Sequence, residues 1–448
     1  MTRTQAYRPD PRILELGSDF YDPVTPARFP AATERFVNRR AAAEVGLEDV
    51  DWARHFHRFE PLPDNLPEPL ALRYHGHQFR HYNPDLGDGR GFLFAQLRDD
   101  RNRLLDLATK GSGQTPWSRT ADGRLTLKGA VREILATEML EALGVRTSRS
   151  FAMFETGEDL VRNDEPSPTR SAVLTRLSHS HIRIGTFQRL AYFEDTANLA
   201  KLTRYCLEHL FDDDPDAGPV RLLDRVAQAT AELAASYLAA GFVHGVLNTD
   251  NINVTGESFD YGPWRFAPTW DPQFTAAYFD HAGLYAFGRQ PEAIQWNLAQ
   301  LAGCLALIAD APPLSDLLQG WGERFHQALV AAILKRLGLA PTDPDQDRAL
   351  VRQVIAELGR QQIGIDRFFF DARAGRLAAL ADPDLRRQLE TRVRPVTHPY
   401  WQDDQPCSLL IDEVEAIWAP IAEADDWLAF GGKLSAIWRM GAAFRADA

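Results

Sequence analysis

The sequence predicts an α+β protein in two lobes, a strand-rich first lobe that carries one key helix and a mainly helical second lobe. Short apolar runs separated by Gly-rich turns fill residues 71–188, which is the pattern of β-strands and their connections. After about residue 190, apolar residues recur at helical spacing, as amphipathic helices require. We expect an N-terminal arm over 1–70, the strand-rich lobe over 71–188, and the helical lobe with a C-terminal helical extension over 189–448.

The first 70 residues are rich in Pro and Arg, and we expect them to lie as an arm on the body. The clearest strands that follow are 91–97 and 104–109, both dominated by apolar residues. One strong helix, at about 128–143, interrupts the strands. Its apolar residues fall on one face, and Gly144 is placed to end it.

A second clear helix is predicted at about 222–240, where apolar residues share one face and Gly241 follows. Similar spacing predicts further helices near 293–309, 322–337, 346–359 and 410–424. The dipeptide Pro291-Glu292 is typical of a helix start.

Composition excludes several classes of function. The 448 residues carry a formal net charge of −13, which argues against nucleic-acid binding because phosphate backbones require a basic surface. Three widely spaced cysteines predict neither a disulfide framework nor a zinc site. Charges and prolines stand where a signal peptide would need an apolar run, and the longest apolar stretch is too short to span a bilayer. We expect a cytoplasmic protein with no nucleic-acid or membrane partner.

The first group of candidate site residues lies in the strand-rich region. Gly87-Asp88-Gly89-Arg90-Gly91 separates two strand-like runs; glycines let backbone N–H groups approach a phosphate, and arginine adds bidentate charge. A simple hairpin turn explains the same residues. Lys110 ends a strand and Glu133 lies on the strong helix. In protein kinases a strand lysine is held by a helix glutamate so that it points at phosphate, and these two residues have the order that such a pair needs.

The second group follows the helix that ends at Gly241. His244-Gly-Val-Leu-Asn-Thr-Asp250-Asn251 and Asp260-Tyr261-Gly262 follow in order, as the catalytic loop and D-F-G motif do in kinases. Aligned in this way, Asn251 and Asp260 are metal ligands, and oxygen ligands of this kind suit magnesium. Val246 stands where a kinase has its catalytic aspartate, and Asp250 is the nearest substitute. An Asx-rich capping loop is the alternative interpretation.

Two arginines, Arg176 and Arg183, flank the junction of the two predicted lobes. Fixed positive charge at that place would neutralise a triphosphate. Surface ion pairing explains them equally well from the sequence alone.

Several longer motifs together resemble the selenoprotein O family (SelO/YdiU) over roughly residues 15–310. They are Tyr74-His-Gly-His-Gln-Phe, Leu86-Gly-Asp-Gly-Arg, Lys110-Gly-Ser-Gly-Gln-Thr-Pro-Trp-Ser-Arg, Asp122-Gly-Arg, Arg132-Glu-Ile-Leu, His244-Gly-Val-Leu-Asn-Thr-Asp-Asn and Asp260-Tyr-Gly-Pro. The resemblance implies a protein-kinase-like (pseudokinase) fold that binds ATP in a flipped orientation. It also implies transfer of AMP to Ser, Thr or Tyr hydroxyls of other proteins with release of pyrophosphate.

The resemblance also implies residue roles. Asp250 would be the proton acceptor, Glu133 would anchor Lys110, and Asn251 and Asp260 would hold Mg²⁺, or Mn²⁺ in its place. The nucleotide would be bound by Gly87, Gly89, Arg90, Lys110, Asp122, Gly123, Arg176, Arg183 and Asp260.

Three alternatives to AMP transfer remain open at the level of sequence. The donor could be UTP, with manganese, giving UMP transfer. Ordinary γ-phosphoryl transfer is disfavoured by Val246. A catalytically silent nucleotide-binding scaffold would need no base, whereas Asp250 is available as one.

Overall fold

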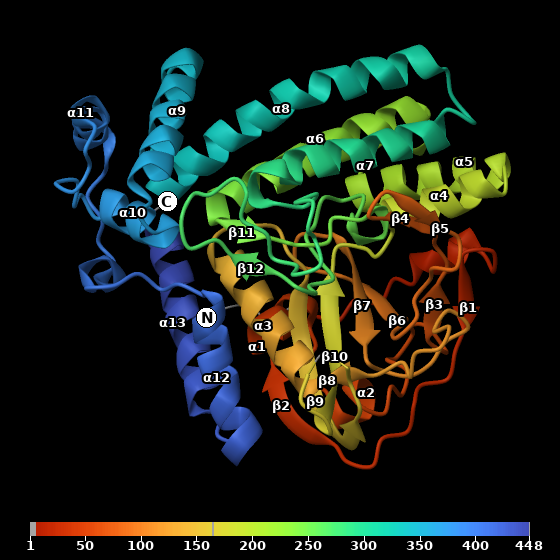
Figure 1. The fold of residues 1–448 in the computed structure, drawn as a ribbon. Coiled ribbons are helices and arrows are strands. Elements are labelled where there is room, and N and C mark those ends of the chain that lie inside the picture. The colour runs from red at the N-terminus through yellow and green to blue at the C-terminus, as the bar shows by residue number, and fades with distance from the viewer. Residues whose placement is uncertain (1–5, 164, 448) are drawn as a thin grey trace.

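The computed structural model describes residues 6–163 and 165–447. Within them, the largest sheet has eight strands in the order β1-β3-β6-β7-β10-β9-β2, with β8 paired to β10, and every pairing is antiparallel. Figure 1 shows this sheet on one side of the molecule and the long helices on the other. The strands are β1 (Tyr21–Pro23), β2 (Thr33–Val37), β3 (Leu70–Leu72), β6 (Leu93–Arg98), β7 (Leu104–Lys110), β8 (Leu125–Thr126), β9 (Arg149–Leu160) and β10 (Thr169–Ser178).

Both faces of the sheet are covered, which explains why all seven residues of β7 are buried. Side chains alternate between the faces. On β9, the neighbouring residues Met153 and Phe154 lie on opposite faces: Met153 joins the main core, and Phe154 joins a second, aromatic-rich core. That second core lies under α1 (Arg39–Val45) and α2 (Trp52–Phe56). A strand buried on both faces reads as a continuous apolar run, and this run made β7 recognisable in the sequence.

The other face is covered by α3 (Leu127–Ala142), which packs on β9 and β10. The side chain of Thr126 accepts a hydrogen bond from the backbone N–H of Gly129 and so caps the first turn. Gly144 has φ +81° just beyond the last turn, a conformation that favours glycine. Glu133 is buried on this helix, and its place on α3 brings it to the end of β7.

The helices that follow form a layer beside the sheet (Figure 1). They begin with α4 (Ile184–Tyr192) and α5 (Thr196–Tyr205). The long α6 (Gly218–Ala240) packs against α7 (Gln290–Leu305) and α8 (Ala311–Leu337). Gly241 ends α6 with φ +68°. Two small strand pairs lie beside this layer: β4 (Gly76–Gln78) with β5 (His81–Asn83), and β11 (Phe242–Val243) with β12 (Arg265–Phe266).

The remaining helices extend the molecule and return to the sheet. They are α9 (Pro344–Gln361), α10 (Ile365–Arg373), α11 (Pro383–Arg392), α12 (Ile411–Ala424) and α13 (Leu428–Ala446). The last of these packs along α3 (Figure 1). The C-terminal segment therefore backs the helix that carries Glu133.

The α+β class is confirmed, and the predicted helices and the two clearest strands all form. We expected residues 1–70 as an arm; residues 1–5 lie outside the described part of the chain, and residues 6–70 supply β1 and β2 at the two edges of the sheet. The long strands β9 and β10 and the helix α13 were not identified individually. None of the helices in the described part of the chain has the length and hydropathy needed to cross a membrane.

Candidate functional site

Lys110 is the centre of a buried cluster of charges. Its Nζ lies 2.6 Å from Oε2 of Glu133 and 3.0 Å from Oδ1 of Asp260. The lysine is 4% exposed and Glu133 is 1% exposed, so water screens these charges weakly. The end of β7, the middle of α3 and the segment after β11 thus meet at one ammonium group.

Arg176, on β10 next to β7, adds a second buried cation. Its Nη1 lies 3.6 Å from Oε1 of Glu133 and 3.5 Å from Oδ1 of Asp260. Among the described residues, its Nε and Nη1 are buried and have no hydrogen-bond partner. Buried donors of this kind are rare in native proteins, and the oxygens of an anionic ligand would satisfy them.

Asp260 stays ionised because of its cationic neighbours. Burial alone would raise its pKa, but Lys110 and Arg176 hold the pKa well below the usual range. The residue has φ +62°, which Asp and Asn tolerate better than most other residues. A carboxylate in this state at neutral pH is suited to bind a divalent cation.

The pKa of Asp250 is shifted in the opposite direction to that of Asp260. Asp250 lies in the short helical turn Thr249–Asn251 and is 7% exposed. Burial raises its pKa to about 6. Within residues 6–163 and 165–447, its Oδ1 atom is buried without a hydrogen-bond partner. A carboxyl group with a pKa near neutrality can both hold and release a proton at physiological pH.

The neighbours of Asp250 come from β4. A Cβ atom at Gly76 would lie 2.8 Å from Oδ1 of Asp250, so the absence of a side chain at Gly76 permits this approach. The side chain of Gln78 hydrogen-bonds the Asp250 carboxyl and lowers its pKa. Nearby, Nδ1 of His77 is hydrogen-bonded to the side-chain amide of Gln188 at 2.6 Å.

Asn251 directly follows Asp250, and its Nδ2 donates to the carbonyl of Val246 at 2.9 Å. This bond fixes the amide in the loop. In the described chain, no group of three or more His, Cys, Asp or Glu side chains is placed to hold a metal ion. The donors present here are two carboxylates and an amide (Asp250, Asp260 and Asn251), and hard oxygen donors of this kind fit Mg²⁺ or Mn²⁺.

The glycine-rich segment 87–91 packs tightly against the segment that follows β7. A Cβ at Gly89 would lie 2.9 Å from the carbonyl oxygen of Trp117, and one at Gly91 would lie 2.0 Å from that of Thr109. The N–H of Gly111 donates to the carbonyl of Arg90 at 2.7 Å. Gly87 is equally crowded by the Trp117 ring. Arg90 is exposed at the surface, and its charge contributes to the low pKa of Asp260.

Arg183 connects the glycine-rich segment to the start of α4. Its Nη2 lies 3.5 Å from Oδ1 of Asp88, and its guanidinium stacks over the rings of Tyr74 and Phe259 at 4.1 and 5.0 Å. The sequence did not predict that Asp88, Tyr74 and Phe259 contact Arg183. Asp88 lies inside the predicted turn, where its role as a counter-charge has no signature in the sequence.

Asp122 and Gly123 lie in the loop between β7 and β8. The carboxyl group of Asp122 pairs with Arg162 at 2.8 Å rather than with the Lys110 cluster. Gly123 has φ +70°, and a Cβ there would lie 2.3 Å from the carbonyl carbon of Gly113. The loop is therefore folded back on itself, and these two residues shape it.

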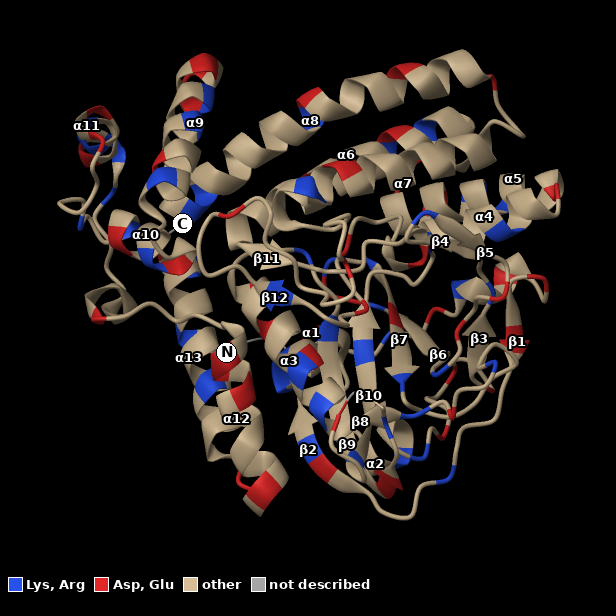
Figure 2. Cartoon of the chain, viewed as in Figure 1, with Lys and Arg blue, Asp and Glu red and all other residues tan. Residues whose placement is uncertain are grey.

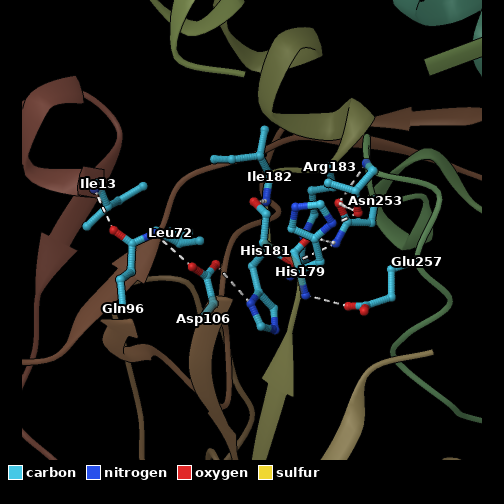
Figure 3. A network of polar contacts seen from close by, with 12 residues as sticks. Ile13, Leu72, Gln96, Asp106, His179, His181, Ile182, Arg183, Asn253 and Glu257 are labelled. Atoms are coloured by element: carbon cyan, nitrogen blue, oxygen red, sulfur yellow. Dashed lines mark hydrogen bonds and ion pairs between the residues drawn. The ribbon is translucent and has the colours of Figure 1, made fainter. Parts of the chain in front are cut away.

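The segment between β10 and α4 is bonded to the segment between Asn251 and Asp260 (Figure 3). The N–H of His179 donates to Glu257 at 2.6 Å, and Nδ2 of Asn253 donates to the carbonyl of Ser180. Burial raises the pKa of Glu257 to about 7. His181 approaches Asp106 of β7 at 3.2 Å. These bonds hold Asp260 and Arg183 at fixed positions relative to the sheet.

Comparisons with known proteins show which family the chain resembles. Residues 4–403 match the model of the family described as protein adenylyltransferase SelO. Curated relatives include proteins named protein nucleotidyltransferase YdiU. The one from Synechocystis sp. is 39% identical over 94% of this chain and 96% of its own length. The one from Synechococcus elongatus is 41% identical over 93% of this chain and 92% of its own length. A third, from Vibrio cholerae, is 36% identical over 80% of this chain and 73% of its own length.

Proposed function

The chain belongs to the SelO family of protein adenylyltransferases and is a nucleotidyltransferase, and from this premise we propose that it transfers AMP from ATP to Ser, Thr or Tyr hydroxyls of other proteins. In the proposed reaction the hydroxyl oxygen attacks the α-phosphorus. The bond from the α-phosphorus to the oxygen that bridges to the β-phosphate then breaks, and pyrophosphate leaves.

The observation that carries the proposal is the buried cluster in which Lys110 contacts both Glu133 and Asp260, with Arg176 beside it. Negative charge grows on the β- and γ-phosphates as pyrophosphate leaves. Fixed cations in a weakly screened site stabilise that charge strongly. Lys110, Arg176 and Arg183 would supply these cations, while Gly87, Gly89, Arg90, Asp122 and Gly123 would shape the rest of the nucleotide site.

Asp250 supports the proposal as the proton acceptor. Its pKa of about 6 leaves most of the carboxyl ionised at pH 7, yet basic enough to take the proton of the attacking hydroxyl. The proton would pass from the hydroxyl to the carboxylate and afterwards to water. Val246 has no group that could do this.

A divalent cation, Mg²⁺ or Mn²⁺, fits the donors of Asn251 and Asp260, and when bound it would neutralise phosphate charge. Asp260 then needs to be ionised, and its depressed pKa keeps it so. The cation and the ammonium group of Lys110 would then both contact the carboxylate of Asp260.

We propose further that the fold is a two-lobe, protein-kinase-like fold. The order of a strand lysine, a helix glutamate, an Asp-Asn loop and an Asp-Tyr-Gly segment is that of a kinase. The ion pair between Lys110 and Glu133 supports this relation. For attack at the α-phosphorus, ATP would then bind in the kinase-like site in the orientation opposite to the one it has in protein kinases.

Mass spectrometry of a protein substrate after reaction tests the proposed donor and acceptor. The protein is incubated with ATP and UTP together, with Mg²⁺ in one arm and Mn²⁺ in another, and modified peptides are sequenced. AMP on Ser, Thr or Tyr supports the proposal. UMP as the main adduct would mean that UTP, and not ATP, is the donor. A phosphate adduct would mean that the chain is a kinase. Unmodified peptides would support the silent-scaffold alternative.

A further inference from the structure

A cavity lies away from the proposed nucleotide site, where the ends of α3, α8 and α13 meet α6. Its volume is about 690 Å³, which is within the range of sites that hold small organic ligands. None of the candidate site residues lines it. It is therefore a separate feature of the molecule.

The body of this cavity is apolar. Its walls include Ala142 and Leu143 of the α3 end, Ala239 of α6, Leu334 of α8 and Phe444 of α13. Apolar walls of this kind favour a hydrocarbon chain or ring, because contact with it removes apolar surface from water.

The rim of the cavity is positively charged. Lys335, Arg394 and Arg445 line it and are exposed, and in the described chain none of the three forms an ion pair with a carboxylate. A fourth cation, Arg336, is paired with Asp366. Glu141 also lines the cavity and lies 3.1 Å from Arg40. Figure 2 shows basic positions at the end of α8 next to the C-terminus.

Helix ends explain only part of this charge. Lys335 and Arg445 lie in the last turns of α8 and α13, where cations stabilise a helix. Arg394 lies outside any helix, in the segment after α11, and so lacks that explanation. Three unpaired cations around one apolar cavity are also unexpected in a chain of net charge −13.

We propose that this cavity binds an amphipathic anion, a single-chain carboxylate of the fatty-acid class, with its chain among the apolar walls and its carboxylate at Lys335, Arg394 and Arg445. The ligand would contact α3, α6, α8 and α13 together. Because it binds the folded chain, its presence also raises the melting temperature. The inference does not depend on the proposed AMP transfer.

Isothermal titration of the full chain with laurate, below the concentration at which laurate forms micelles, tests the proposal. We expect saturable binding at one site. Dodecanol, which has the chain without the charge, and acetate, which has the charge without the chain, should each bind at least tenfold more weakly. Dodecanol or acetate binding as tightly as laurate, or no saturable binding of laurate, would overturn the proposal.

A triple variant locates the site. Lys335→Ala, Arg394→Ala and Arg445→Ala together should weaken laurate binding at least tenfold. The matched control changes three exposed arginines away from the cavity, Arg28, Arg39 and Arg352, to Ala and should keep the affinity within twofold. Equal losses in the two variants would contradict the assignment.

Hydrogen–deuterium exchange of the unchanged protein gives an independent readout. Bound laurate should slow exchange at 139–144, 331–341 and 441–445. Protection confined to other segments would place laurate elsewhere and overturn the proposal.

Discussion

The Nζ atom of Lys110 lies 3.0 Å from Oδ1 of Asp260, so the proposed phosphate-binding cation and the proposed metal ligand are paired with each other. In the proposed reaction this contact would be exchanged in part for contacts to a nucleotide and a cation. The same lysine keeps its bond to Glu133 at 2.6 Å. The first two predictions concern these two carboxylates.

Asp260→Asn should abolish metal-dependent ATP binding and transfer while leaving the fold intact. Asparagine is the suitable replacement because it tolerates the positive φ of this position. Calorimetric titration with ATP, with and without Mg²⁺, measures the effect, and Asp271→Asn, an exposed aspartate in the following loop, is the control. Undiminished transfer by the Asp260→Asn variant would remove this residue from the mechanism.

Glu133→Gln should lower both stability and transfer. Removing one partner of a buried ion pair typically costs about 3–5 kcal/mol, and the contact of Lys110 with Asp260 should place the loss at the lower end. Urea unfolding gives the stability and a transfer assay at saturating ATP gives the rate.

Glu138→Gln is the matched control for this change, because Glu138 is a second buried glutamate on α3 whose partners are Asn38, Arg40 and Trp438. It should lower stability without lowering transfer per folded molecule. Equal losses of transfer in the two variants would mean that Glu133 acts through stability alone.

The pKa of Asp250 predicts opposite effects on activity and stability. Transfer should fall as pH drops through about 6, because the base becomes protonated. A carboxyl pKa raised from 3.8 to about 6 makes the ionised form destabilising above pH 6, and this penalty disappears below about pH 4. Asp250→Asn should therefore abolish transfer yet raise the free energy of unfolding at pH 7.5 by up to roughly 3 kcal/mol.

The stability gain of Asp250→Asn should shrink towards zero as pH approaches 4. Glu257 also has a raised pKa, so the difference between wild type and variant, and not either curve alone, isolates Asp250. Thermal unfolding at pH 7.5 and pH 4.5 measures it. A variant that is equally stabilised at both pH values would show that the ionisation of Asp250 is not the cause.

Gly76→Ala should reduce transfer while the chain stays folded. The new Cβ would lie 2.8 Å from Oδ1 of Asp250, so the carboxyl group must move. Gly303→Ala is the control: it lies in α7 with open space around it and should add about 0.5–1 kcal/mol of stability with transfer unchanged. Full transfer by the Gly76→Ala variant would show that the position of Asp250 is not critical.

Local patterns predicted much of the fold. The helices α3 and α6 were found because their apolar residues share one face and a glycine follows each. The long strands β9 and β10 were not found, because polar and charged residues such as Glu155, Asp159 and Arg170 interrupt them, so they show neither a continuous apolar run nor a regular alternation. The helix α13 mixes apolar and polar residues around its circumference, and its packing on α3 is a long-range property.

The candidate site was predictable where a motif has fixed order. Lys110, Glu133 and Asp260 follow the kinase order, and the fold brings them within hydrogen-bond distance. Arg183 was predicted as a phosphate ligand, but its partners Asp88 and Tyr74 come from separate turns. The raised pKa of Asp250 arises from burial, which no spacing in the sequence reveals.

The most direct test of the central claim is incubation of the protein with Mg²⁺ and ATP labelled at the α-phosphate, in parallel with ATP labelled at the γ-phosphate, followed by autoradiography of the protein bands. The account predicts label from the α-position alone, pyrophosphate released in proportion, and neither signal with Asp260→Asn. Label from the γ-position alone would contradict it and make the enzyme a kinase despite Val246.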